Sequence, residues 1–132
     1  AALKPNPMWH DLCKITDLPA DNRGLYLEYQ GRPLAVFRTT DGHGHTHVHV
    51  LDDRCPHAGG SLSAGALTPQ ATPGIPGATC VICPMHGWPF NIATGQCPDN
   101  PAWKVRTYAA RVNQHMVQIR DNSAGDANPF GG

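Results

Sequence analysis

The chain has 132 residues, enough for one domain with a hydrophobic core and tight for two. Ten Asp and Glu balance ten Lys and Arg, so the charge does not indicate a nucleic-acid partner or an electrostatic membrane anchor. No apolar run approaches the roughly 20 residues that a membrane-spanning helix needs, and the first residues lack the apolar region of a signal peptide. We therefore expect a cytoplasmic protein without nucleic-acid or membrane partners.

Short strands are the elements that the sequence predicts. Thirteen Pro and fourteen Gly divide the chain, and no window keeps a helical period of apolar residues. We expect a first strand around Cys13. Alternating or β-branched runs predict further strands over residues 24–29, 34–39, 46–51, 78–82, 105–112 and 115–119. Residues 30–33, 41–42 and 94–95 suit hairpin turns. The sequence thus predicts a small antiparallel all-β fold over residues 1–121.

Two segments are predicted to lie outside the strands. Residues 68–77 (TPQATPGIPG) include three Pro and two Gly, which favours a loop. The tail 122–132 has the composition of a disordered segment.

Four His alternate in the run His43, His45, His47 and His49. With a strand over 46–51, His45, His47 and His49 would share a face opposite the Val residues. Such a face could bind zinc or nickel weakly, but no carboxylate or thiolate nearby in sequence completes a tetrahedral set. We interpret the run as the solvated face of a strand.

Two short loops, CPHAGG at 55–60 and CPMHGW at 83–88, each provide one thiolate and one imidazole after a predicted strand. Such a ligand set suits a structural zinc ion, or a [2Fe–2S] cluster with thiolates on one iron and imidazoles on the other. Zinc fingers usually pair ligands of one type, whereas these loops mix them, which favours the cluster. Imidazoles in place of two thiolates raise the reduction potential from about −400 mV to roughly −150 to +300 mV. Gly59, Gly60 and Gly87 would let backbone N–H groups approach the sulfurs.

With their ligands, prolines and glycines in register, the two loops resemble those of the Rieske [2Fe–2S] proteins. The resemblance implies a small β-sandwich or barrel with a cluster-binding part over about 53–103. It also implies that Cys55 and Cys83 hold the inner iron, and that His57 and His86 hold the outer iron near the surface, where electrons enter and leave.

Departures from the pattern place the chain within the family. High-potential members carry an extra Cys in each loop, and the two form a disulfide; Gly60 and Met85 stand there in this chain. Those members also supply Ser and Tyr hydroxyls to the cluster, where this chain has Trp88 and Phe90. Fewer donors to sulfur imply a lower potential and the ferredoxin-type branch. The 25 residues between His57 and Cys83 exceed the usual number, which matches the insert 68–77.

The flanking sequence, WHDLCKITDLPADNRG and TGQCPDNPAWKVRTYAARVNQHMVQI, resembles the small subunit of NAD(P)H-dependent nitrite reductase. In that family, which serves nitrate assimilation, a large subunit with flavin, siroheme and a further iron–sulfur cluster reduces nitrite to ammonia. This chain has no G-x-G-x-x-G after a strand, so it would transfer electrons without being catalytic alone.

The other Cys and the Trp residues have ordinary interpretations. Cys13 and Cys80 are expected to be small buried hydrophobes. Cys97 begins CPDNPAW, which resembles the loop that lies over the cluster in Rieske proteins, with Pro101 limiting solvent access. The Trp residues suit packing, and Trp88 could orient the His ligand in its loop.

Three functions stay open on the sequence. The first is one-electron transfer in a nitrite reductase, with the large redox subunit as partner. The second is a freestanding Rieske ferredoxin that feeds a ring-hydroxylating oxygenase, and the third is a structural zinc-binding module. Because reduction would raise the proton affinity of His57 and His86, a Rieske centre predicts a pH-dependent potential.

Overall fold

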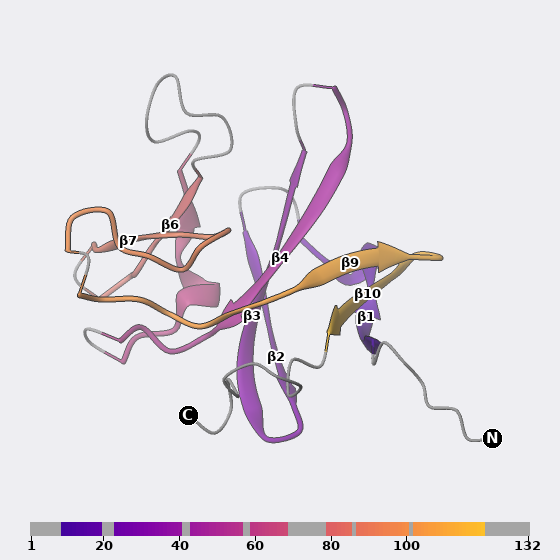
Figure 1. Cartoon of the computed structure of the whole chain (residues 1–132), viewed down its shortest axis with the longest axis horizontal. Helices are drawn as coiled ribbons and strands as arrows, with labels where there is room; N and C mark the ends of the chain where they lie inside the picture. The colour runs from indigo at the N-terminus through magenta and orange to yellow at the C-terminus, as the bar shows by residue number, and fades with distance from the viewer. Residues whose placement is uncertain are drawn as a thin grey trace.

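The computed structural model describes residues 9–19, 23–40, 43–56, 59–68, 79–85, 87–100 and 102–120. Within these ranges the chain forms ten strands, two short 3₁₀ helices and no α-helix. The strands make three antiparallel sheets (Figure 1). The prediction of an antiparallel all-β fold is confirmed. No helix in the described ranges is long and apolar enough to span a membrane.

The central sheet has the order β2-β3-β4-β8. Its members are β2 (Gly24–Tyr29), β3 (Arg32–Thr40), β4 (Thr46–Asp52) and β8 (Thr107–Tyr108). The turn from β2 to β3 consists of Gln30 and Gly31, with φ of 53° and 81°, as in a two-residue type I′ hairpin. It is shorter than the predicted turn 30–33, because Pro33 already pairs with Glu28 in the ladder.

The second sheet joins the two ends of the described chain. Its order is β1 (Trp9–Lys14), β10 (Met116–Arg120) and β9 (Ala110–Asn113). The predicted strand 105–112 is divided, since Tyr108 belongs to the central sheet and Ala110 to this one. The short helix η1 (Ile15–Asp17) follows β1 directly.

The third sheet carries the loops of interest. It consists of β5 (Ala66–Leu67), β6 (Cys80–Ile82) and β7 (Pro89–Asn91), and the helix η2 (Leu62–Ala64) leads into it. In Figure 1, β6 and β7 lie on one side of the β2–β3–β4 sheet and the β1–β10–β9 sheet lies on the other. β5 and β7 were not predicted, because their two and three residues form no alternating or β-branched run that a period of two could reveal.

Hydrophobic side chains fill both faces of the central sheet. Alternation along β3 directs Ala35 and Phe37 into one core cluster and Leu34 and Val36 into another. The first cluster contains Cys55, Cys83 and Cys97. The thiols of the candidate site are therefore part of a core that the central sheet supports.

Some predicted segments lie outside the described residues. These are the turn 41–42, the insert from residue 69 on and the tail 122–132. They remain predictions.

Candidate metal centre

The two Cys loops have the same backbone hydrogen bonds. In each, the Cys N–H donates to the carbonyl oxygen five residues later, and the Gly N–H four residues later donates to the Cys carbonyl oxygen. The N···O distances are both 2.8 Å in the loop of Cys55 and both 2.9 Å in the loop of Cys83. The Gly has a positive φ in both, 73° at Gly59 and 78° at Gly87, which side chains other than Gly seldom adopt. Two segments far apart in sequence thus fold to one loop shape.

Both loop thiols are buried. Cys55 is 1% exposed and Cys83 is 0% exposed. None of the five Cys, all of which lie in the described ranges, forms a disulfide. Because Cys55 and Cys83 are not bound in a disulfide, their thiols are available as metal ligands. Their burial would keep water away from that side of a metal site.

The loops meet at Gly60. A Cβ added to Gly60 would lie 3.2 Å from Sγ of Cys83 and 2.5 Å from Cγ of Met85. Both contacts are closer than ordinary van der Waals separations, so a side chain at this position would fill the space beside the second thiol. The missing Cβ leaves a cradle between the two loops.

The predicted ligands His57 and His86, and Pro101, lie outside the described residues. Their described neighbours in sequence, Pro56, Met85 and Gly87, are exposed. Among the described residues no group of three or more His, Cys, Asp or Glu could hold a metal. The structure therefore brings together two of the four predicted ligands and leaves the other two as predictions.

Trp88, the last residue of the second thiol loop, packs against the ring of Trp103. The Trp88 and Trp103 ring centroids are 4.4 Å apart with planes at 67°, an edge-to-face arrangement. Both rings pack against the core cluster that contains the two thiols. The N–H of the buried Cys97 donates to the carbonyl oxygen of Trp103 at 3.1 Å and closes the CPDNPAW loop. The interpretation of these Trp residues as packing is confirmed, and shielding by Pro101 stays a prediction.

The His run is only partly solvated, which corrects the interpretation above. His43, His45 and His47 are exposed, but His49 is half-buried opposite Phe37 of β3. Its Nε2 lies 3.1 Å from Oγ1 of Thr39. Burial, and then the neighbouring His47, lower the pKa of His49 to about 4.

The two remaining Cys are not alike. Cys80 is 2% exposed, as expected, and burial raises the pKa of its thiol. Cys13 is only partly buried, where it packs against the second core cluster. Burial, with Asp17 nearby, raises the pKa of Cys13 to about 11, so its thiolate is disfavoured at neutral pH.

Asp53 lies directly before the first loop and was not among the predicted site residues. It is 5% exposed, and its carboxylate accepts hydrogen bonds from Oγ of Ser61 at 2.6 Å and from the N–H of Ser63 at 2.7 Å. No pattern distinguishes it from its exposed or half-buried neighbours in DDRC. Only the tertiary structure shows that it is buried beside the first loop.

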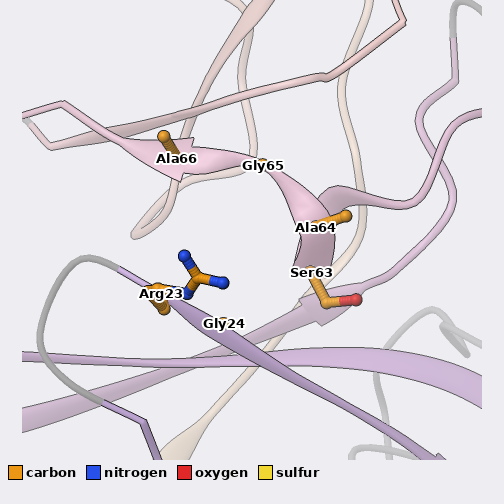
Figure 2. Close-up of a pocket in the computed structure, with 6 residues that line it drawn as sticks. All are labelled: Arg23, Gly24, Ser63, Ala64, Gly65 and Ala66. Atoms are coloured by element: carbon orange, nitrogen blue, oxygen red, sulfur yellow. The ribbon is translucent and has the colours of Figure 1, made fainter.

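A cavity of about 170 Å³ lies at the start of β2, next to η2 and β5 (Figure 2). The residues that line it are Arg23, Gly24, Ser63, Ala64, Gly65 and Ala66. Arg23 is the one charged side chain among them. This cavity includes none of the predicted site residues.

Comparison with known families matches residues 8–109 to the Rieske [2Fe-2S] domain. Among curated relatives, cholesterol 7-desaturase of Caenorhabditis elegans is 29% identical over 93 residues, which cover 70% of this chain and 19% of that protein. The oxygenase component of 3-ketosteroid-9-alpha-monooxygenase of Rhodococcus rhodochrous is 33% identical over 104 residues, or 79% of this chain and 21% of that protein. The chain thus spans about a fifth of the length of these two relatives.

Solved structures of similar length match more completely. E. coli NirD has a TM-score of 0.71 and 26% identity, and the match covers 88% of this chain and 98% of NirD. A putative NADH-dependent nitrite reductase small subunit from Mycobacterium tuberculosis also has a TM-score of 0.71 and 26% identity, covering 86% and 95%. A chain from the complex of reduced oxygenase and oxidized ferredoxin in carbazole 1,9a-dioxygenase has a TM-score of 0.65 and 26% identity, covering 87% and 94%.

Proposed function

The chain belongs to the Rieske [2Fe-2S] domain family, and from this premise we propose that Cys55 and Cys83 hold one iron of its cluster while His57 and His86 hold the other. Several described features support the proposal. The two thiols are buried in one core cluster, on loops of one backbone shape that meet at Gly60. The missing Cβ of Gly60 leaves space beside the second thiol for an inorganic group. These features fit a cluster-binding cradle.

The division of ligands has a chemical consequence. Cys55 and Cys83 would hold their iron on the water-excluded side, whereas exposed Pro56, Met85 and Gly87 flank the predicted imidazoles. When bound, a Rieske-type [2Fe–2S] cluster supplies reversible one-electron transfer. The loops of this chain would thus bury the thiolates and keep the imidazoles near the surface, where a partner can approach.

The redox partner that we propose is the large subunit of a nitrite reductase, with the nitrite chemistry on that subunit. The observation that supports this step is the match over nearly the full length of E. coli NirD and of a putative NADH-dependent nitrite reductase small subunit. The proposal implies a cytoplasmic electron-transfer component that is not catalytic alone.

The test is reconstitution with a flavin- and siroheme-containing large subunit. We expect a stable complex on gel filtration, and a rise in NAD(P)H-dependent nitrite reduction when the chain is added. The matched control is Cys83→Ser, which removes one proposed iron ligand at a buried position. An electron-transfer role in this reaction would be contradicted if the native chain formed the complex but did not raise the rate of nitrite reduction. It would also be contradicted if the native chain and Cys83→Ser raised that rate equally.

A second partner class has its own support. A chain from an oxygenase–ferredoxin complex matches over 94% of its length at a TM-score of 0.65. A freestanding ferredoxin would reduce the cluster of a ring-hydroxylating oxygenase in rapid-mixing experiments without forming a stable complex. Rapid reduction of such an oxygenase, together with no complex with the siroheme subunit, would favour this alternative.

A further inference from the structure

Asp53 lies between the end of β4 and the first ligand loop, and its backbone and its side chain both make hydrogen bonds. Within the described ranges it is the one charged side chain that is buried, at 5% exposure. Its N–H donates to the carbonyl oxygen of Pro33 at 3.0 Å, and its own carbonyl oxygen accepts from the N–H of Leu62 at 2.7 Å. A buried carboxylate is costly unless hydrogen bonds satisfy it, and here Ser61 and Ser63 provide two.

The two ligand loops differ in what holds their ends together. The second loop closes a hairpin, because Ile82 pairs with Pro89, Val81 with Phe90 and Cys80 with Asn91. The first loop is flanked by one isolated bridge, between Arg54 and Ser61, after which the chain enters η2. Among the described residues, no strand ladder joins the two ends of the first loop.

The carboxylate of Asp53 takes the place of that ladder. The first N–H groups of a helix have no partner within the helix, and Ser61 at the N-cap of η2 makes no capping hydrogen bond of its own. Instead, the N–H of Ser63 and the hydroxyl of Ser61 both donate to Asp53. The side chain of Asp53, before the first loop, thus holds Ser61 and Ser63, which follow that loop.

The position of this exit matters because Gly60 immediately precedes Ser61. Gly60 accepts the hydrogen bond from the N–H of Cys55, and it is also the point at which the loop meets the thiol of Cys83. A shift of Ser61 would therefore move Gly60 and change the separation of the two loops.

We infer that Asp53 is a positioning residue for the cluster: its carboxylate holds Ser61 and Ser63 and so fixes the Cys55 loop against the Cys83 loop. This inference rests on the proposed function, since it takes the two Cys as ligands. It assigns Asp53 no contact with iron or sulfide.

The test compares Asp53→Ala and Asp53→Asn in the full chain, loaded with its cluster under anaerobic conditions. We expect Asp53→Ala to shift the g values of the reduced protein and to speed cluster loss to a chelator about tenfold. Asp53→Asn should restore both towards the native values, because the amide oxygen can accept from Ser63 and the amide N–H can donate to Oγ of Ser61.

The matched control is Tyr108→Phe. Its hydroxyl donates to Asp52, the residue next to Asp53, and belongs to the other core cluster. The control removes a hydrogen bond of the same kind away from the loops, so it should lower the melting temperature and leave the g values and the rate of cluster loss unchanged.

Native g values and native cluster retention in Asp53→Ala would overturn the inference. If Asp53→Ala does not fold, Ser61→Ala replaces it, because that variant loses one of the two hydrogen bonds and keeps the one from the backbone. Ser61→Ala should then lose its cluster at least threefold faster than the native chain, and an unchanged rate would overturn the inference. A native chain that binds zinc and no iron would instead overturn the proposed [2Fe–2S] cluster, and the inference with it.

Discussion

Gly60 illustrates how a single residue can determine whether two loops approach each other. A Cβ at this position would lie 2.5 Å from Cγ and 3.5 Å from Cβ of Met85. Met85 is 56% exposed and can rotate away, whereas the thiol of Cys83 is fixed in the core. The two positions that carry a disulfide in high-potential Rieske proteins are therefore neighbours in this chain too, without sulfur on either.

This proximity predicts that the combination of Gly60→Cys and Met85→Cys forms a disulfide under mild oxidation. The 3.5 Å between the two Cβ positions lies at the short end of the usual range, about 3.5–4.5 Å. Peptide mapping by mass spectrometry would identify a bond between positions 60 and 85. In the control, Gly59→Cys with Met85→Cys, a Cβ at position 59 would face Arg54 instead, so no bond is expected. Equal cross-linking in both pairs would contradict the loop geometry.

His49 predicts a pH dependence of stability. Its pKa is lowered to about 4 in the folded chain from 6.5, chiefly by burial. Below pH 6.5 the unfolded chain binds a proton that the native chain does not, so the free energy of unfolding falls by up to about 1.4 kcal/mol per pH unit, down to about pH 4. Urea denaturation at pH 7.0 and 4.5 should show a smaller loss for His49→Gln than for the native chain. The exposed His45→Gln should behave as the native chain, and identical losses in all three would refute the assignment.

At the scale of elements, the same loop shape occurs a third time. The N–H of Asn91 donates to the carbonyl oxygen of Gln96 at 3.0 Å, and the N–H of Gly95 to that of Asn91 at 2.7 Å. Gly95 has a φ of 81°. This third loop carries no Cys or His, so the backbone shape by itself does not define a metal site. The ligand side chains placed on it are what distinguish the other two loops.

Gly95 in this third loop also fixes the path of the chain back to the central sheet. A Cβ there would lie 2.0 Å from the carbonyl oxygen of Val105. We predict that Gly95→Ala costs about 3 kcal/mol or more, since backbone must move. Gly31 has the same φ of 81°, but a Cβ added there would have no atom within 4 Å. Gly31→Ala should therefore reduce the free energy of unfolding by only about 1 kcal/mol. Chemical denaturation of both variants would check this, and equal losses would show that the contact with Val105 is unimportant.

Local patterns predicted some elements and not others. The hairpin of β2 and β3 follows from alternating side chains and a Gln-Gly turn, which are local features. The division between β8 and β9 does not, because the chain changes sheets there to pack Tyr108 into the second core. Ligand spacing is also a local feature, and it indicated Cys55 and Cys83 as candidate ligands. Asp53 carries no such local signal, since its partners depend on how η2 packs.

At the scale of the whole molecule, the central sheet separates two cores, and the two candidate thiols, Cys55 and Cys83, lie in one of them. The β1–β10–β9 sheet packs with the other core. The third sheet and both Cys loops share the core of the two thiols. Metal binding stabilises the folded state that binds the metal. The stabilisation should be largest in the core that contains both Cys loops, because there the metal would join two segments that are far apart in the sequence.

We therefore predict that removal of the iron affects the two cores differently. In hydrogen–deuterium exchange, protection of the backbone amides of Val81 and Cys83 should fall about tenfold or more after chelation. Protection of Val117 in β10, at the far core, should change much less. A uniform loss across both cores would show instead that the cluster stabilises the fold as one cooperative unit.

The central claim is that two Cys and two His hold a [2Fe–2S] cluster in this chain. An EPR spectrum of the anaerobically purified protein, before and after reduction with dithionite, tests it most directly when iron, sulfide and zinc are assayed on the same sample. The account predicts about two irons per chain, and a rhombic signal that appears only on reduction and carries nitrogen couplings. Those couplings should be lost in His57→Cys and His86→Cys together. Stoichiometric zinc without a signal, or a reduced cluster without nitrogen couplings, would contradict the account.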